Sequence, residues 1–288
     1  MSDKNLVYLT LKDYSVSGEE FKLLYNSETD MLETYPQPKL ENLPKYYESS
    51  NYISHTDSKE SVVDKLYQIV KKATLKSKLK LINSFNSQEK DILDIGCGTG
   101  EFLLTCKYGG WNVVGVEPNV NAKHLANQKL YKKTSSKIVD DINKIKTQQF
   151  DVITLWHVLE HIPNIDNYIS KLKSLLKPSG ILIVAVPNYK SFDALYYKKY
   201  WAAFDVPRHL WHFSKKSIQL LFSNQNLNIE KKLPMYFDSF YVSMLSEKYK
   251  TGKYNFSKAF LIGLYSNLKA IRSKEYSSLI YVIRRAEN

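Results

Sequence analysis

Apolar residues in this chain gather in short runs of strand length, which alternate with stretches that suit helices. The strand-length runs lie at about 92–95, 112–117, 136–139, 150–155, 181–186, 227–233 and 279–283. The stretches between them predict helices that end near residue 108 and that span about 119–130 and 166–176. Runs that are apolar on both faces are typical of parallel strands covered by helices. The alternation therefore predicts an α/β fold with a mostly parallel sheet.

A glycine-rich turn follows the first of these runs, in the stretch DILDIGCGTGEFLL at 91–104. The turn contains, in order, Gly96, Cys97, Gly98 and Gly100. Glycines at alternate positions let a backbone turn sharply and approach a ligand closely. A helix that begins just after such a turn points its free N–H groups at whatever is bound. The bland alternative is a structural loop without a ligand.

The chemistry around the turn separates two kinds of nucleotide ligand. Dinucleotide-binding turns have the spacing G-x-G-x-x-G, whereas the spacing here is G-x-G-x-G and Asp94 precedes it. A carboxylate at that place would repel a pyrophosphate but would pair with an ammonium group. Glu117, followed by Pro118, ends the next apolar run, where a nucleotide-binding unit places its ribose-binding acid. These residues favour S-adenosylmethionine, which joins a nucleoside to a zwitterionic amino acid.

Four stretches resemble, in order and spacing, the successive motifs of class I S-adenosylmethionine-dependent methyltransferases. They are LDIGCGTGEFL at 93–103, VVGVEPN at 113–119, FDVITLWHVLEHIPN at 150–164 and LLKPSGILIVAVPN at 175–188. The resemblance is strong over about 91–188 and continues more weakly to the C-terminus. It implies a Rossmann-like, seven-stranded, mostly parallel sheet with an antiparallel last strand at 279–283. It also implies S-adenosyl-L-methionine as the cofactor.

The resemblance and the strand ends together give a set of expected cofactor-binding residues. Ligands of such folds lie beyond the carboxyl ends of the parallel strands, so Trp156 and His157 are expected near the methionine part. Asp141 is expected to accept the adenine amino group while Ile142 packs on the ring; alternatively, Asp141 caps a helix. The full set is Asp94, Gly96, Cys97, Gly98, Gly100, Glu117, Pro118, Asp141, Ile142, Trp156 and His157.

His157, Glu160 and His161 are spaced i, i+3 and i+4. On a helix they would share one face, a spacing that can hold a divalent ion. Some methyltransferases with a similar E-x-x-E-H sequence bind a metal there, but the first position here is histidine. We therefore expect a structural Glu–His pair and no metal.

The acceptor side is expected after Pro187 and Asn188. The stretch 191–213 is dense in aromatic residues and contains DVPRHL, which resembles a segment of small-molecule methyltransferases of sugar, lipid and quinone pathways. The Asn/Asp-Pro-Pro-aromatic signature of enzymes that methylate bases or glutamine amides is absent. A small-molecule hydroxyl is thus the expected acceptor, with His209 as its base, Arg208 as an anion clamp and His157 as a further catalytic residue. In the alternative, Arg208 and His209 only tie the loop to the core.

Two further regions flank the methyltransferase motifs. Residues 1–51 are expected to form a small N-terminal β cap, which resembles a zinc ribbon that has lost its cysteines. Residues 52–288 are the expected methyltransferase domain, with a helix at about 58–85 and a helical insertion at 234–276. The insertion is interpreted as packing on its own core or on a second subunit to form a homodimer, rather than as an amphipathic membrane site. Tyr46, Tyr47 and Tyr52 are candidates to line the cofactor site.

Composition narrows the remaining function classes. The formal charge of +12 favours anionic partners, although a solvated basic surface is the preferred interpretation, without nucleic acid and without favoured membrane contact. The only cysteines, Cys97 and Cys106, can build neither a disulfide framework nor a thiolate zinc site. The N-terminus does not resemble a signal peptide and no apolar run is long enough to span a bilayer, so a cytoplasmic protein is expected. The alternatives are an NAD-dependent oxidoreductase, a non-catalytic cofactor-binding or membrane-docking protein, and a nucleic-acid methyltransferase.

Overall fold

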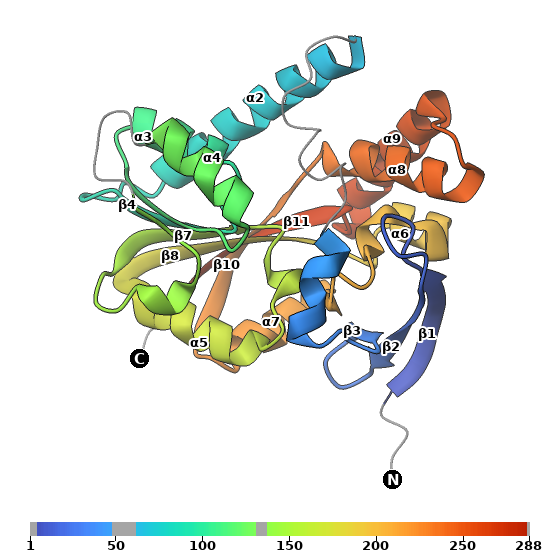
Figure 1. Cartoon of the computed structure of the whole chain (residues 1–288), viewed down its shortest axis with the longest axis horizontal. Helices are drawn as coiled ribbons and strands as arrows, with labels where there is room; N and C mark the ends of the chain where they lie inside the picture. Colours follow the sequence, from blue (N-terminus) through green and yellow to red (C-terminus); the bar gives the residue numbers. More distant parts are fainter. Residues whose placement is uncertain (1–4, 48–61, 131–136, 287–288) are drawn as a thin grey trace.

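The computed structural model describes residues 5–47, 62–130 and 137–286 of the 288-residue chain. Its centre is a seven-stranded sheet with helices on both faces, and a small antiparallel sheet lies beside it (Figure 1). The large sheet contains β4 (Asp91–Ile95), β5 (Asn112–Val116), β6 (Lys137–Val139), β7 (Phe150–Trp156), β8 (Leu176–Pro187), β10 (Leu227–Pro234) and β11 (Ser278–Arg285). These strands match the runs in the sequence.

The order of strands across the sheet is β10-β11-β8-β7-β4-β5-β6. Strand β11 runs antiparallel to both β8 and β10, whereas the pairings among β8, β7, β4, β5 and β6 are parallel. The expected Rossmann-like sheet with an antiparallel last strand is confirmed. Because β4 and β5 are neighbours, their carboxyl ends bring the glycine turn and Glu117 to the same edge of the sheet.

Helices cover the sheet as its two apolar faces require. They are α2 (Val62–Asn83), α3 (Glu101–Tyr108), α4 (Val120–Leu130), α5 (Ile165–Leu175) and α7 (Lys215–Ser223). Figure 1 shows α3 and α4 on one side of the sheet and α5 and α7 on the other. The central strands β4, β7 and β8 are almost wholly buried as a result. The N-terminal end of the helix expected at 58–85 lies outside the described residues.

The sequence of Pro178, Ser179 and Gly180 predicts a turn before the strand at 181–186, but this strand boundary is wrong. Strand β8 runs without interruption from Leu176 to Pro187, but its register against β7 jumps from Phe150 opposite Leu176 to Val152 opposite Ile181. Residues 177–180 therefore bulge out of the ladder while the backbone on either side stays extended. Proline has no backbone N–H. It is tolerated at this irregular position because the strand ladder needs no donor there.

The small sheet contains β1 (Asn5–Lys12), β2 (Glu20–Asn26), β3 (Met31–Tyr35) and β9 (Trp211–His212), in that order. Its first three strands form the N-terminal β cap, and η1 (Leu40–Tyr47) follows them. The fourth strand comes from the aromatic stretch, so residues 211–212 complete the cap by pairing with β3. A zinc-ribbon origin for this segment stays a hypothesis.

The aromatic stretch and the insertion form a helical layer beside the sheets. It contains α6 (Phe192–Tyr197), η4 (Lys198–Tyr200), η5 (Ala202–Phe204), α8 (Asp238–Thr251) and α9 (Phe256–Ser273). Asp193, which is fully buried, fastens this layer by accepting hydrogen bonds from Trp201 Nε1, Ser266 Oγ and Ser277 Oγ, each at 2.7 Å. Among the described residues, no helix combines the length and hydrophobicity that crossing a bilayer requires.

Candidate functional site

The glycine turn between β4 and α3 has a backbone that only glycine adopts readily. Gly96, Gly98 and Gly100 have φ values of 66°, 53° and 79°. The N–H groups of Gly96 and Cys97 donate to the carbonyl oxygen of Val116 at 2.8 and 3.1 Å, which fixes the turn to β5. A Cβ added at Gly98 would meet no atom within 4 Å. The turn therefore presents backbone at open space, as a ligand cradle should.

Glu117 closes the other side of this cradle. One carboxylate oxygen accepts the Gly98 N–H at 2.8 Å, and the other accepts the Asn119 N–H at 2.9 Å. Burial raises the pKa of Glu117, and these two backbone groups oppose the shift. Its remaining lone pairs can accept the two hydroxyls of a ribose. Pro118, which follows it, is exposed, and the Cys97 side chain packs into the core.

Asp94 and Lys78 place opposite charges at the end of β4. Asp94 is 3% exposed and accepts a hydrogen bond from Thr154 Oγ1 at 2.6 Å. Burial raises the pKa of Asp94 to about 7, against the effects of Thr154 and Lys78. Burial also lowers the pKa of Lys78 to about 8, although Asp94 and Asp238 favour its charged form. The two groups suit a ligand that carries both an ammonium and a carboxylate.

Trp156 and His157 follow β7 beside this charge pair. The Lys78 Nζ lies 4.0 Å from the centroid of the Trp156 ring, and the buried Trp156 Nε1 has no hydrogen-bond partner among the described residues. His157 Nε2 lies 3.0 Å from Asp238 Oδ2. The unpaired indole N–H is a donor for a ligand oxygen. Trp156 and His157 thus follow the strand that pairs with β4, which carries Asp94.

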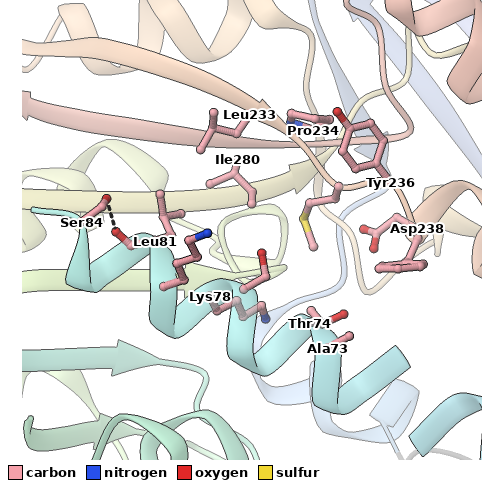
Figure 2. A pocket seen from close by; sticks show the side chains of 14 residues that line it. Ala73, Thr74, Lys78, Leu81, Ser84, Leu233, Pro234, Tyr236, Asp238 and Ile280 are labelled. Carbon is pink, nitrogen blue, oxygen red and sulfur yellow. Dashed lines mark hydrogen bonds between the residues drawn. The ribbon is translucent and has the colours of Figure 1, made fainter. Parts of the chain in front are cut away.

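A groove of about 380 Å³ adjoins the charge pair, between α2 and the connection from β10 to α8 (Figure 2). Lys78 and Asp238 line it together with Met235, Tyr236 and Phe237. Figure 2 shows side chains from α2 and from this connection facing one another across it. The groove therefore lies beside Lys78 and Asp238.

Sequence reasoning missed Lys78 and Asp238. The sequence predicts a solvated basic face for the lysines of the helix at 58–85, but Lys78 lies on the same face as Leu75 and Ile82, which pack in the core. A lysine at an apolar position of an amphipathic helix was the available signal. Nothing in the sequence marked Asp238, because only the fold brings α8 to the end of β7.

Asp141 and Ile142 sit at the end of β6. The Asp141 side chain accepts the Asn143 N–H at 2.8 Å and caps the short helix η2 (Ile142–Lys144), which is the alternative role foreseen for it. Ile142 is buried in the core with Val139 and Ile145. Their contact with an adenine stays a prediction.

The DVPRHL segment lies away from the groove. Arg208 is 6% exposed and binds Asp205 through Nε and Nη2, while its Nη1 donates to the carbonyl of Tyr46 at 2.9 Å. His209 is also buried, and its Nδ1 lies 2.9 Å from the carbonyl of Ala203. This geometry favours the alternative in which both residues tie the loop to its surroundings. The donors that Arg208 would need for an anionic substrate are already engaged.

His157, Glu160 and His161 do not share a helical face. Only a short 3₁₀ turn, η3 (Leu159–His161), forms, and His157 precedes it with φ of 57°. His157 Nδ1 still lies 3.5 Å from Glu160 Oε1, so the expected Glu–His pair exists. His161 instead stacks edge-on against His209, with 4.6 Å between ring centroids. Tyr47 contacts His161, Tyr46 is buried against Glu19, and Tyr52 lies outside the described residues.

Known proteins share parts of this sequence and its fold. Ubiquinone biosynthesis O-methyltransferases of Rhodopseudomonas palustris (strain TIE-1) and Actinobacillus pleuropneumoniae serotype 7 are 32% and 35% identical to it over 108 residues. The matched region is 35% and 34% of this chain, and 42% and 46% of those proteins. The chain therefore spans less than half the length of the curated relatives it matches.

Solved structures agree on the fold at low identity. The magnesium protoporphyrin IX methyltransferase of Synechocystis PCC 6803 with bound SAH has a TM-score of 0.55 at 17% identity, covering 81% of this chain and 91% of its own. Mycolic acid cyclopropane synthase CmaA1 has a TM-score of 0.53 at 15% identity, covering 73% and 83%. A family model described as a methyltransferase domain matches residues 67–232. That match covers more than half of the chain, which therefore belongs to the methyltransferase-domain family.

Proposed function

We propose that this protein binds S-adenosylmethionine over its glycine turn and transfers the methyl group to a hydroxyl of a small molecule. The observation that carries the proposal is the opposed pair Asp94 and Lys78 at the end of β4. A carboxylate and an ammonium there complement the zwitterionic amino acid of this cofactor. The pyrophosphate of NAD would instead meet the Asp94 carboxylate, which disfavours an oxidoreductase.

Each part of the cofactor has a partner of suitable chemistry in this chain. Asp94 would hold the amino group, and Lys78 with the unpaired Trp156 N–H would hold the carboxylate. Glu117 would accept the ribose hydroxyls beside the open space at Gly98. Asp141 and Ile142 remain our candidates for the adenine end. The bound cofactor supplies an electrophilic methyl group on a sulfonium.

The acceptor would enter through the groove between α2 and α8. Its aromatic and apolar lining by Met235, Tyr236 and Phe237 suits an aromatic or lipid-like compound, and the names of the relatives favour oxygen over nitrogen or carbon. His157 contacts Asp238, which lines this groove, and this contact fixes the imidazole ring. We assign His157 to orienting the acceptor hydroxyl, in preference to His209, which lies behind it.

Calorimetric titration with S-adenosylhomocysteine tests the cofactor half of the proposal. Micromolar binding by the wild type, lost in Asp94→Asn and weakened in Lys78→Met, is the expected result. Lys76→Met is the matched control, because Lys76 is an exposed lysine on the same helix. Binding of NAD but not of S-adenosylhomocysteine would overturn the assignment. Transfer of a labelled methyl group to simple phenols, compared with their amino analogues, then tests the acceptor atom.

A further inference from the structure

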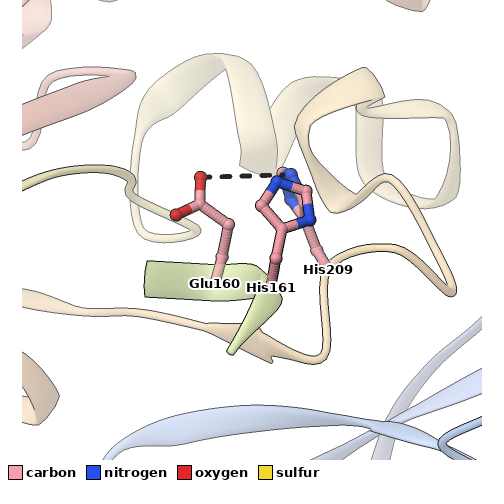
Figure 3. A group of neighbouring side chains, drawn as sticks. All are labelled: Glu160, His161 and His209. Carbon is pink, nitrogen blue, oxygen red and sulfur yellow. Dashed lines mark ion pairs between the residues drawn. The ribbon is translucent and has the colours of Figure 1, made fainter. Parts of the chain in front are cut away.

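A second polar cluster lies behind His157 and is not used by the proposed reaction. It contains Glu160, His161 and His209, each of which offers a ligand atom within 4.8 Å of the others (Figure 3). Glu160 is 1% exposed, and neither of its carboxylate oxygens has a hydrogen-bond partner among the described residues. A buried carboxylate without donors is costly, so this group requires an explanation.

The two imidazoles turn their lone pairs toward this carboxylate. His161 Nδ1 lies 2.9 Å from the carbonyl oxygen of Arg208, and His209 Nδ1 lies 2.9 Å from that of Ala203. A carbonyl oxygen only accepts, so each Nδ1 carries the hydrogen and each neutral ring keeps a lone pair on Nε2. His209 Nε2 lies 4.0 Å from Glu160 Oε1. Three acceptor groups therefore converge on one point.

Another acidic cluster in the described part of the chain shows the ordinary way to satisfy such groups. Glu89, Asp91 and Asp151 surround the ammonium of Lys177, which lies 2.5, 2.9 and 3.0 Å from their carboxylate oxygens. Within the described residues, the ion pairs of Glu160 involve only histidines, at 3.5 and 4.0 Å. Glu160 has His157 as its charged neighbour, because Asp238 and Glu160 raise the pKa of that imidazole to about 10 against the effect of burial. His157 lies closer to Asp238, at 3.0 Å, so Glu160 shares this cation and has none of its own among the described residues.

We infer that Glu160, His161 and His209 bind a divalent transition-metal ion, and the ligand set of two imidazoles and one carboxylate fits Zn²⁺. Ligating histidines characteristically donate their other ring N–H to a backbone carbonyl or a carboxylate, as both imidazoles do here. Atoms that share a zinc ion at about 2.0–2.2 Å lie roughly 3–4 Å apart, so the cluster closes around it with small side-chain shifts. The ion joins the end of β7 to the DVPRHL segment, and water completes its coordination.

Metal titration of the full-length protein tests this site without any measurement of methyl transfer. After treatment with EDTA and dialysis, the wild type is expected to bind one equivalent of Zn²⁺ and to give a visible absorption band with Co²⁺. Glu160→Gln and His209→Gln are expected to weaken Zn²⁺ binding about 100-fold or more, because each removes a ligand. His124→Gln is the control, since His124 is an exposed histidine on α4. Circular dichroism verifies the fold of each variant, and His161→Gln replaces either one that fails to fold.

Three outcomes would overturn the metal site. The wild type could fail to bind Zn²⁺ or Co²⁺ at stoichiometric concentration, or Glu160→Gln could bind as tightly as the wild type. Nuclear magnetic resonance could also detect a stable imidazolium on His209 in a protein that binds no metal, which would mean that a proton takes the place of the ion. Failure of the methyltransferase proposal would leave all these readouts unchanged.

An independent observation concerns helix α9, whose outer face is more apolar than its inner face. Its buried residues are all small: Ala259, Gly263, Ser266 and Ala270. Its exposed residues include Phe256, Phe260, Leu261, Leu264, Tyr265, Leu268 and Ile271, each between 38% and 62% exposed. The small inner residues let α8 approach closely, since a Cβ at Gly263 would lie 2.8 Å from the Phe240 ring. The Phe260 ring stacks on Phe240 and the Tyr265 ring meets Phe192 edge-on, yet both side chains remain largely exposed. An exposed apolar patch of this kind marks a docking surface.

The segment that carries the apolar patch is strongly basic, which indicates an anionic partner. Between residues 239 and 274 the basic residues are Lys248, Lys250, Lys253, Lys258, Lys269, Arg272 and Lys274. The one acidic residue in that range, Glu247, is buried and paired with Lys258 at 3.1 Å. A second copy of a chain with net charge +12 would bring like charges together, whereas anionic lipid headgroups complement them. We propose that the outer face of α9 docks on an anionic lipid surface.

Vesicle sedimentation tests the lipid proposal. The wild type is expected to bind phosphatidylglycerol vesicles, to bind phosphatidylcholine vesicles at least tenfold more weakly, and to detach as salt rises. The variant Leu261→Asp/Leu268→Asp is expected to lose this binding, whereas Val120→Asp, an exposed apolar residue on α4, is expected to retain it. Equal binding by the double variant, or a dimer in light scattering that the double variant dissociates, would overturn the proposal.

Discussion

The Lys78 ammonium and the Asp94 carboxylate come from a helix and a strand end, and each favours the charged form of the other inside the protein. Lys78 also lies 4.0 Å above the ring of Trp156, which holds its charge near the end of β7. Burial works against both charges, so the pair costs stability in the free protein. A zwitterionic ligand would compensate both groups at once, which makes binding and stability depend on pH in predictable directions.

Affinity for S-adenosylhomocysteine is expected to rise about five- to tenfold between pH 6 and pH 7.5. Asp94 has a pKa of about 7 and binds the ligand ammonium only when ionised, while Lys78, with a pKa of about 8, remains mostly charged over this range. Calorimetry at several pH values measures the effect. Asp94→Asn should bind weakly with little pH dependence, and an equally steep profile in that variant would assign the titration to another group.

The stability of the ligand-free protein is expected to fall as pH rises from about 5.5 to 7.5. The pKa of Asp94 is raised above its unfolded value, so between these values the native state holds a proton that the unfolded state has lost. Glu117 acts in the same direction. Asp94→Asn should exceed the wild type by about 1 kcal/mol or more at pH 7.5, roughly 2–4 °C in Tm, and by less at pH 5.5. Thermal melts at both pH values decide this, and a constant difference would contradict it.

The residues proposed to bind the cofactor could be predicted from the sequence as one set because each lies close to the end of a strand. Asp94, the glycines and Glu117 each follow directly from a strand, and the carboxyl ends of neighbouring parallel strands must meet. The sequence did not predict the roles of Lys78 and Asp238, because their positions depend on how α2 and α8 pack against the sheet. The sequence also did not predict the pairing of residues 211–212 with β3, because a two-residue strand is too short to show a periodic pattern. The proline at 178 indicated a turn, but in the structure it lies in a bulge within strand β8.

The variants Gly96→Ala and Gly98→Ala are expected to differ in their effects. The first should mainly lower stability, and the second should mainly lower affinity for the cofactor. Both residues have positive φ, so each substitution costs about 1 kcal/mol of backbone strain. A Cβ at Gly96 would also lie 2.5 Å from Val158 Cγ2, whereas at Gly98 it enters open space. Gly96→Ala should therefore be the less stable variant in urea denaturation by a further 1–3 kcal/mol. Gly98→Ala should fold but bind S-adenosylhomocysteine poorly, and normal affinity there would place the cofactor elsewhere.

Arg208→Lys is expected to lower stability by about 2 kcal/mol and to leave cofactor affinity unchanged. The guanidinium binds Asp205 through two nitrogens and also reaches Asp13 and the carbonyl of Tyr46, and lysine cannot reproduce this planar fork. Asp13 directly follows β1 of the N-terminal sheet, so the loss should loosen that sheet first and expose it to limited proteolysis. Lys198→Met is the control, because it changes a basic residue in the same helical layer without breaking this network. If Arg208→Lys instead kept its stability and raised only the KM of an anionic acceptor, the original interpretation of Arg208 as a substrate clamp would be correct.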